Sequence, residues 1–142
     1  MTSRESSVLE YKEAVSKTFL KTVSSYANFH TGKVIFGIDD DWNTVGLDDP
    51  IDECLRIENM INDCIEPLPR FILEPDTKSK TVTLTVYEGT HKPYLFKGKA
   101  YRRSDSSTVE VDRLEYGRLV LEGSNSTYDS IPSNEQNLTF SI

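Results

Sequence analysis

The sequence predicts an α+β domain with a mixed, mainly antiparallel sheet of about five or six strands and two or three helices. Two segments, residues 13–28 and 50–66, carry apolar side chains at helical spacing. Residues 80–87 alternate strictly, with Val82, Leu84 and Val86 on one face and threonines on the other. The 142 residues match the usual size of a single domain, so we expect these elements to share one core.

The N-terminal elements are expected to be a strand, a helix, a second strand and its hairpin partner, over residues 7–12, 13–28, 33–38 and 44–47. The helix has Val15, Phe19, Val23 and Tyr26 on one face. The second strand is a nearly continuous apolar run, which is typical of a strand buried on both faces. Asn28 and Gly32 are expected to shape the turn between helix and strand.

A second helix is expected to begin at Asp49, which can cap it, followed by Pro50 at the first helical position. Its predicted apolar stripe is Ile51, Cys54, Leu55, Ile61, Cys64 and Ile65. Strands are expected next over residues 70–74, 80–87 and 99–103, with a short piece at 94–96, and a last helix over 112–121. After Gly123 the composition becomes rich in turn residues. We therefore expect residues 1–122 to form the domain, and residues 123–142 to be a linker or the start of a following region of a longer protein.

Composition limits the classes of protein to which the chain can belong. The first residues lack the apolar run of a signal peptide, and no stretch approaches the roughly 18 apolar residues of a membrane span. Cys54 and Cys64 stand ten residues apart in one predicted helix, or about 15 Å, which is too far for a disulfide. We expect buried thiols, a cytoplasmic protein and no membrane partner.

The charges are unevenly distributed along the chain. The net charge is −7, whereas nucleic-acid-binding domains are more often basic. Residues 38–66 hold ten acids and only Arg56 as a base (10 − 1, net −9), and residues 67–103 hold eight bases and three acids (8 − 3, net +5). The split indicates either one basic face on an acidic molecule or two ordinary solvated faces.

A few acidic residues form a candidate site. Glu10 and Lys12 are two apart on a predicted strand, so their side chains share a face. Asp39 and Asp40 follow a central strand, where sites often form. Carboxylates brought together from two segments could hold a divalent cation such as Mg²⁺ or Mn²⁺. Spacing alone favours the simpler alternative, a structural Glu10–Lys12 ion pair and a solvated aspartate turn.

Three sequence stretches resemble one family when they are taken in order. They are ESSVLEYK at residues 5–12, YANFHTGKVIFGIDD at 26–40, and PY at 93–94 followed by YRRSDSST at 101–108. Together they resemble the Schlafen AlbA-type domain, also called the divergent AAA-type DNA-binding domain, over roughly residues 3–121. The chain departs from the common pattern at Phe29, Thr31 and Asp105.

The resemblance implies the N-terminal part of a bacterial transcriptional regulator, with nucleic acid as the partner and with any ATP site in a following region. Lys12, Lys97, Lys99, Arg102 and Arg103 are the expected nucleic-acid contacts. In eukaryotic Schlafen relatives three acids form a metal-dependent endoribonuclease site, and they match Glu5, Glu10 and Asp40. The alternatives to a DNA-binding domain are therefore an RNA-cleaving enzyme and a non-catalytic scaffold that forms homo-oligomers.

Overall fold

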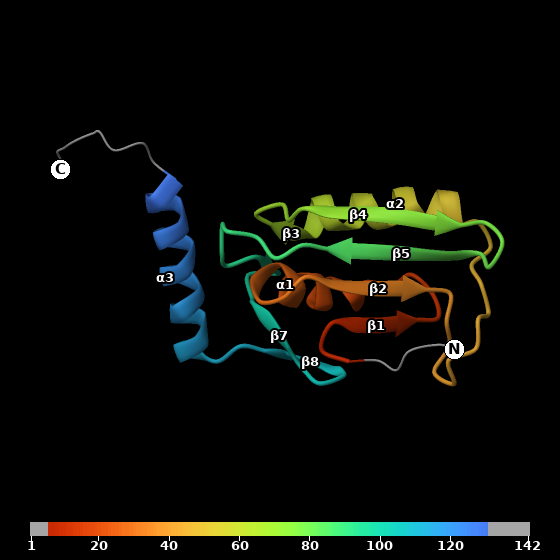
Figure 1. The fold of residues 1–142 in the computed structure, drawn as a ribbon, viewed down its shortest axis with the longest axis horizontal. Helices are drawn as coiled ribbons and strands as arrows, with labels where there is room; N and C mark the ends of the chain where they lie inside the picture. Colours follow the sequence, from red (N-terminus) through yellow and green to blue (C-terminus); the bar gives the residue numbers. More distant parts are fainter. Residues whose placement is uncertain (1–5, 131–142) are drawn as a thin grey trace.

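The computed structural model describes residues 6–130, which form an α+β structure with three helices and eight strands in this part of the chain. The main sheet has four strands in the order β1-β2-β5-β4, made by Leu9–Lys12, Gly32–Phe36, Thr81–Val86 and Phe71–Asp76. β1 and β2 are parallel, and the other pairs are antiparallel (Figure 1). The predicted fold class is confirmed, although the strands are divided among three sheets.

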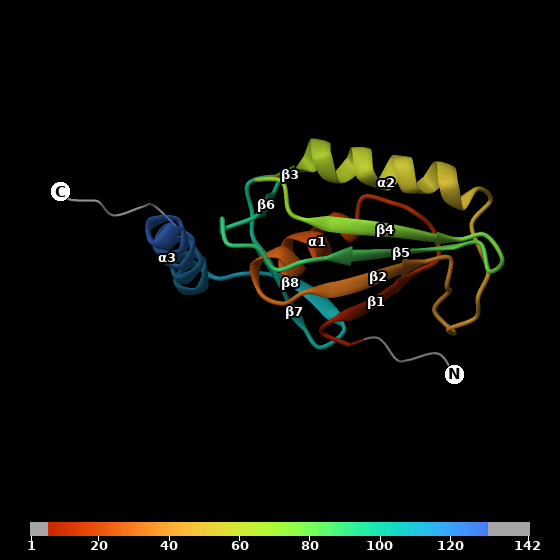
Figure 2. The same ribbon diagram turned by 45° about the horizontal axis from the view of Figure 1, so that its top comes forward.

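The two small sheets lie at one end of the main sheet (Figures 1 and 2). One pairs β3 (Ile65–Glu66) with β6 (Leu95–Phe96), and the other is the hairpin of β7 (Tyr101–Ser104) and β8 (Ser107–Glu110). β8 was not predicted from the sequence. Asp105 lies in the two-residue turn of this hairpin at a φ of 58°, a backbone conformation in which glycine is favoured.

Two helices cover one face of the main sheet (Figure 2). α1 (Phe19–Asn28) and α2 (Pro50–Cys64) share a single apolar core with Val34, Leu84 and Val86 of the sheet. α1 is buried along almost its whole length, because the β7–β8 hairpin packs against it as well as the sheet. Phe19 meets Phe36 edge to face, with ring centroids 5.2 Å apart.

Gly32 starts β2 because the ring of Tyr26 leaves it no room for a side chain. A Cβ atom at this position would lie 2.5 Å from Cε1 of Tyr26. The Tyr26 hydroxyl also donates a hydrogen bond to the carbonyl of Lys33, at 3.2 Å. The turn between α1 and β2 is therefore fixed by a buried aromatic ring packed against bare backbone.

Several predicted boundaries differ from the structure. α1 begins at Phe19 rather than near residue 13, because the chain must first turn off β1. Lys12 and Ser16 hydrogen-bond the Thr18 side chain in that turn. Residues 44–47 form no strand, so the predicted hairpin partner is confirmed only as a short antiparallel contact after β2. Thr44 bridges Ile38, and the amides of Val45 and Gly46 both donate to the Gly37 carbonyl at 2.9 Å.

α2 begins as predicted, with the Asp49 carboxylate accepting a hydrogen bond from the Asp52 amide at 3.1 Å. Its buried stripe is centred on Ile57 and Ile61, however, while Ile51 and Leu55 are more than half exposed. The prediction of these two as core residues is therefore wrong. Cys54 and Cys64 are free thiols, and burial raises the pKa of Cys54.

α3 (Arg113–Ser130) follows β8 and stands at the edge of the molecule (Figure 1). The Asp112 carboxylate caps it by accepting from the amide of Glu115 at 2.8 Å, and Leu119 packs with Ala100 and Val111. The helix runs to Ser130, past the predicted end at residue 121, so the turn-rich composition after Gly123 does not interrupt it. No helix within residues 6–130 combines the length and the hydropathy needed to cross a bilayer.

Candidate functional site

Glu10 lies at the centre of a buried polar cluster. It pairs with Val34 across β1 and β2, so its side chain lies on the sheet face that α1 covers, and the residue is only 6% exposed. The hydroxyl of Thr22 on α1 lies 3.1 Å from each of its carboxylate oxygens. Arg103 of β7 donates from Nη1 to Oε1, and Lys12 Nζ lies 3.6 Å from Oε2. The predicted common face of Glu10 and Lys12 is confirmed.

Arg103 connects this carboxylate to two further segments. Its Nη1 also donates to Thr108 Oγ1 of β8 at 3.0 Å, and its Nη2 donates to the Ser6 carbonyl at 2.7 Å. The side chain is 3% exposed. We call Glu10, Thr22, Arg103 and Thr108 the Glu10 cluster. Breaking a buried, hydrogen-bonded ion pair from one side typically costs about 3–5 kcal/mol, so the Glu10 cluster fastens the β7–β8 hairpin to α1 and β1.

One nitrogen of the Arg103 side chain makes no hydrogen bond. Its Nε is buried and has no hydrogen-bond partner, and no other buried side-chain nitrogen or oxygen in the described part of the chain shares that state. A buried donor without an acceptor costs about 1–3 kcal/mol.

The three acids of the predicted metal site are placed only in part. Glu5 lies outside the described residues. Asp40 follows β2, beyond its end at Phe36. Both carboxylate oxygens of Glu10 already accept hydrogen bonds, and two cationic side chains next to them would repel a divalent ion. The three-acid site therefore stays a prediction.

The neighbouring Asp39 forms a turn instead. Its carboxylate accepts from the amides of Asp41 and Asn43, each at 2.9 Å. Among residues 6–130 there is no group of three or more His, Cys, Asp or Glu side chains that could hold a metal ion.

Lysines from α1, from the turn just before it and from the loop between β6 and β7 lie on one surface. Lys97 lies over the ring of Phe96, with Nζ 5.4 Å from its centroid, and Lys21 lies 5.6 Å from the centroid of Tyr101. The two rings are themselves 6.5 Å apart. Lys17 and Lys97 line one open pocket of about 310 Å³. We call Lys17, Lys21, Lys97 and Lys99, all exposed, the lysine patch.

The lysine patch agrees only in part with the predicted nucleic-acid contacts. Lys97 and Lys99 belong to it, with Lys99 Nζ 3.7 Å from Glu110. Lys12 is turned to Glu10, and Arg103 is buried. Lys17 and Lys21 were not identified from the sequence, although their four-residue spacing within the predicted helix of residues 13–28 is typical of one exposed side. In the structure only Lys21 is on α1, and Lys17 lies in the turn before it.

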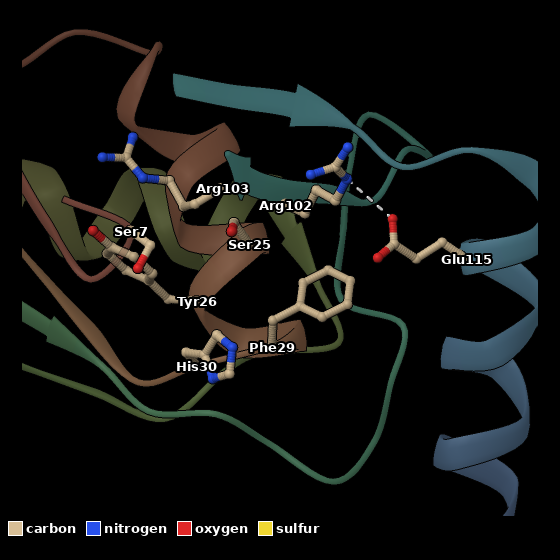
Figure 3. A pocket seen from close by; sticks show the side chains of 8 residues that line it. All are labelled: Ser7, Ser25, Tyr26, Phe29, His30, Arg102, Arg103 and Glu115. Carbon is tan, nitrogen blue, oxygen red and sulfur yellow. Dashed lines mark ion pairs between the residues drawn. The ribbon is translucent and has the colours of Figure 1, made fainter. Parts of the chain in front are cut away.

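Arg102 and Arg103 are neighbours on β7, and their side chains leave the strand in opposite directions (Figure 3). The Arg102 guanidinium reaches the first turn of α3, where its Nε lies 3.2 Å from a carboxylate oxygen of Glu115. Both arginines line a pocket of about 200 Å³ between the C-terminal end of α1 and the start of α3, together with Ser7, Ser25, Tyr26, Phe29, His30 and Glu115.

Asn28 is fully buried and acts over a long range rather than in the turn that follows it. Its side-chain amide donates to the Tyr94 carbonyl at 2.9 Å, and its side-chain oxygen accepts from the Tyr94 amide at 2.7 Å. Ser24 donates to the same carbonyl at 2.8 Å and accepts from the Tyr101 amide at 3.2 Å. α1 thus holds the segments on both sides of β6. The expectation of a local turn role for Asn28 is corrected.

Lys92 fastens α3 to the body of the domain. Its ammonium group lies 2.7 Å from Glu88 and 2.8 Å from Glu122, and the side chain is 9% exposed. Burial lowers the pKa of Lys92, but the hydrogen bonds with Glu122 and Glu88 outweigh it, so the pKa is raised overall. Gly123 packs on the Lys92 carbonyl so closely that a Cβ there would lie 1.9 Å from the oxygen.

Two solved structures are similar to the chain. The crystal structure of the DIP2311 protein from Corynebacterium diphtheriae has a TM-score of 0.54 at 19% identity, over 79% of this chain and 26% of that one. The chain thus corresponds to about a quarter of that relative. The solution structure of the N-terminal domain of a protein from Nitrosomonas europaea, described as related to the ATP-dependent DNA helicase RecG, has a TM-score of 0.44 at 26% identity, over 75% of this chain and 80% of that one.

No curated protein matches the sequence. The model of the Schlafen AlbA_2 family matches residues 5–112. This range contains the Glu10 cluster, the Asn28 contacts and the lysine patch. The matched range is well over half of the sequence and ends where the β7–β8 hairpin joins α3. The chain therefore belongs to the Schlafen AlbA_2 family.

Proposed function

We propose that this domain binds nucleic acid through the lysine patch and serves as the DNA-binding part of a larger transcriptional regulator. The observation that carries the proposal is that Lys21 and Lys97, from two separate segments, lie over the Phe96–Tyr101 pair. Lys17 lines the same pocket as Lys97, and Lys99 is exposed two residues after Lys97. Lysine side chains contact phosphates without regard to sequence and supply most of the non-specific affinity. Membership in the Schlafen AlbA_2 family supports the same conclusion.

The acids of the molecule restrict how a nucleic acid can approach. Asp63 and Glu66 line the same pocket as Lys17 and Lys97, and Glu110 pairs with Lys99. A phosphate backbone would be repelled from α2, where residues 38–66 concentrate the acidic charge. We therefore propose a narrow contact of a few phosphates along α1 and the β6–β7 turn, with low affinity for the isolated domain.

A fluorescence anisotropy titration with single-stranded RNA, single-stranded DNA and duplex DNA of equal length tests the proposal. Four lysine contacts predict a logarithmic salt slope of about −3. Replacing Lys97 and Lys99 by glutamine is expected to weaken binding at least about tenfold at low salt and to reduce the slope by about 1.5–2.

The chain offers a closely matched control. Lys78 and Lys80 also flank a single residue in a turn, both are exposed, and Lys80, like Lys97, has a positive φ. They lie at the opposite end of the main sheet (Figure 1). The Lys78→Gln/Lys80→Gln variant should bind as the wild type does. Equal losses in both variants, or no binding at 50 mM salt, would overturn the proposal.

The same oligonucleotides incubated with Mn²⁺ and Mg²⁺ test the nuclease alternative. Loss of cleavage in Glu10→Gln and Asp40→Ala variants that remain folded would support it. RNA that stays intact with the wild-type protein and either metal would exclude it for this domain.

A further inference from the structure

We propose that the pocket between α1, β7 and α3 is a binding site for a phosphate-type oxyanion, and that the anion competes with Glu115 for Arg102. This site is separate from the lysine patch, since the two pockets share no lining residue. The inference does not depend on the proposed nucleic-acid binding.

The first support is the donor set around the pocket. Arg102, Arg103, His30, Ser7 and Ser25 all line it, with the rings of Tyr26 and Phe29 on one side (Figure 3). Two guanidinium groups, an imidazole and two hydroxyls are the groups that commonly recognise phosphate. A pocket of about 200 Å³ has room for a phosphate group with a small organic part attached.

The second support is the unsatisfied donor. Arg103 is 97% buried by side-chain area (100 − 3), lines this pocket, and has an Nε–H with no acceptor. Its other nitrogens are all engaged with Glu10, Thr108 and the backbone. Buried donors in folded proteins nearly always have partners. An oxyanion in the pocket would supply the missing acceptor once a small shift of the Arg103 side chain exposes Nε, which is otherwise buried.

The third support is the way in which Arg102 is held. Its guanidinium pairs with Glu115, through Nε at 3.2 Å, and the two side chains are 42% and 29% exposed. An ion pair of this exposure is weak, so a phosphate offering two oxygens to the guanidinium can replace it. Glu115 belongs to the first turn of α3. Binding would therefore release one of the contacts that hold the start of α3 against β7.

Substitutions at the two partners should act in opposite directions. Arg102→Gln removes a donor and is expected to weaken phosphate binding about tenfold. Glu115→Gln removes the competitor and is expected to strengthen it several-fold. Glu122→Gln makes the same charge change on the same helix, but it contacts Lys92 instead, and it should leave the affinity unchanged.

Calorimetric titration at constant ionic strength, with chloride as the reference anion, gives these affinities. Inorganic phosphate, a nucleoside 5′-monophosphate and the unphosphorylated nucleoside distinguish the free ion from a phosphomonoester as the ligand. Binding of the monophosphate alone assigns the pocket to a phosphomonoester, whereas equal binding of phosphate assigns it to the ion. No heat with either phosphate, or an equal affinity in Glu115→Gln and wild type, would overturn the proposal.

A spectroscopic measurement covers the case in which a variant fails to fold. In the ¹⁵N spectrum of the wild-type protein, the Arg103 Nε–H signal should shift as phosphate is added, because it gains an acceptor. Titration with phosphate that moves no signal of Arg102, Arg103 or His30 would also overturn the proposal. The Lys97→Gln/Lys99→Gln variant should show the same shift, which separates this site from the lysine patch.

Discussion

Arg102 and Arg103 are adjacent on β7, yet they belong to two very different regions. Arg103 is buried in the Glu10 cluster and bonds to groups from β1 and β8, whereas Arg102 is half exposed and bonds to a single acid on α3. The two arginines differ only by one position along the strand, and successive side chains of a strand point to opposite faces. The inner position is built to hold the fold together, and the outer one is free to exchange partners.

The largest expected effect on stability comes from the buried pair of Glu10 and Arg103. Glu10→Leu leaves the Arg103 charge buried without its partner and should lower the free energy of unfolding by about 3–5 kcal/mol, as measured by urea denaturation. The double variant Glu10→Leu/Arg103→Met replaces the whole pair by apolar groups and should regain more than half of that loss. Losses that simply add would show that the two residues are not coupled.

The Glu10→Gln variant also distinguishes a structural role of Glu10 from a catalytic one. If Glu10 serves structure, Glu10→Gln lowers stability with or without Mn²⁺. The opposite result would be a Glu10→Gln variant that is more stable than the wild type and whose melting temperature no longer rises with Mn²⁺. That result would indicate that Glu10 is a strained metal ligand.

The second expected effect concerns Asn28, another buried polar residue. Asn28→Ala leaves the amide and carbonyl of Tyr94 without their side-chain partner, so it should cost about 1–3 kcal/mol. Asn43 is exposed on a loop, and Asn43→Ala should change stability by less than about 0.5 kcal/mol. Similar losses in the two variants would contradict the assigned role of Asn28.

A smaller effect is expected on the outer side of β7. Arg102→Gln removes an exposed ion pair and should cost about 0–1 kcal/mol. Arg103→Gln, one residue further on, is the matched comparison and should cost several times more. If the two variants unfold at the same urea concentration, Arg103 does not stabilise the fold more than Arg102 does.

The ion pairs of Lys92 should make the stability of the domain depend on pH only at high pH and not near neutral pH. The pKa of Lys92 is raised in the folded state by Glu122 and Glu88. The stabilisation is therefore fully present below the ordinary lysine value of about 10.4 and is lost as the pH rises through the higher folded value. A melting curve followed from pH 8 to 12 should fall less steeply in Glu122→Gln. A steeper or equal fall would argue against this linkage.

Local patterns in the sequence were enough to predict the fold class and most elements. The cap at Asp49, the alternation around Leu84 and the shared face of Glu10 and Lys12 are each settled by residues close together in the chain. The start of α1 was missed because Val15 is buried in a loop, so an apolar position was counted as helical.

The site was harder to predict because its contacts join distant segments. Arg103 meets Glu10 across 93 positions of the sequence, and Asn28 meets Tyr94 across 66. Nothing near Arg103 in the sequence distinguishes it from Arg102. Only the docking of β7 against α1 decides which guanidinium is buried, and that follows from the packing of the whole domain.

The contact between Arg103 and Ser6 also bears on how copies of the domain could associate. β1 is an edge strand of the main sheet, and exposed strand edges invite pairing with other chains. Arg103 donates to the carbonyl of Ser6 just before β1, and the Ser6 amide donates to Leu9 of β1. The opposite edge, β4, contains Pro75 between Glu74 and Asp76, a proline and two charges of the kind that discourage strand addition. Copies of this domain should therefore join neighbours through side-chain surfaces and not by extending the sheet.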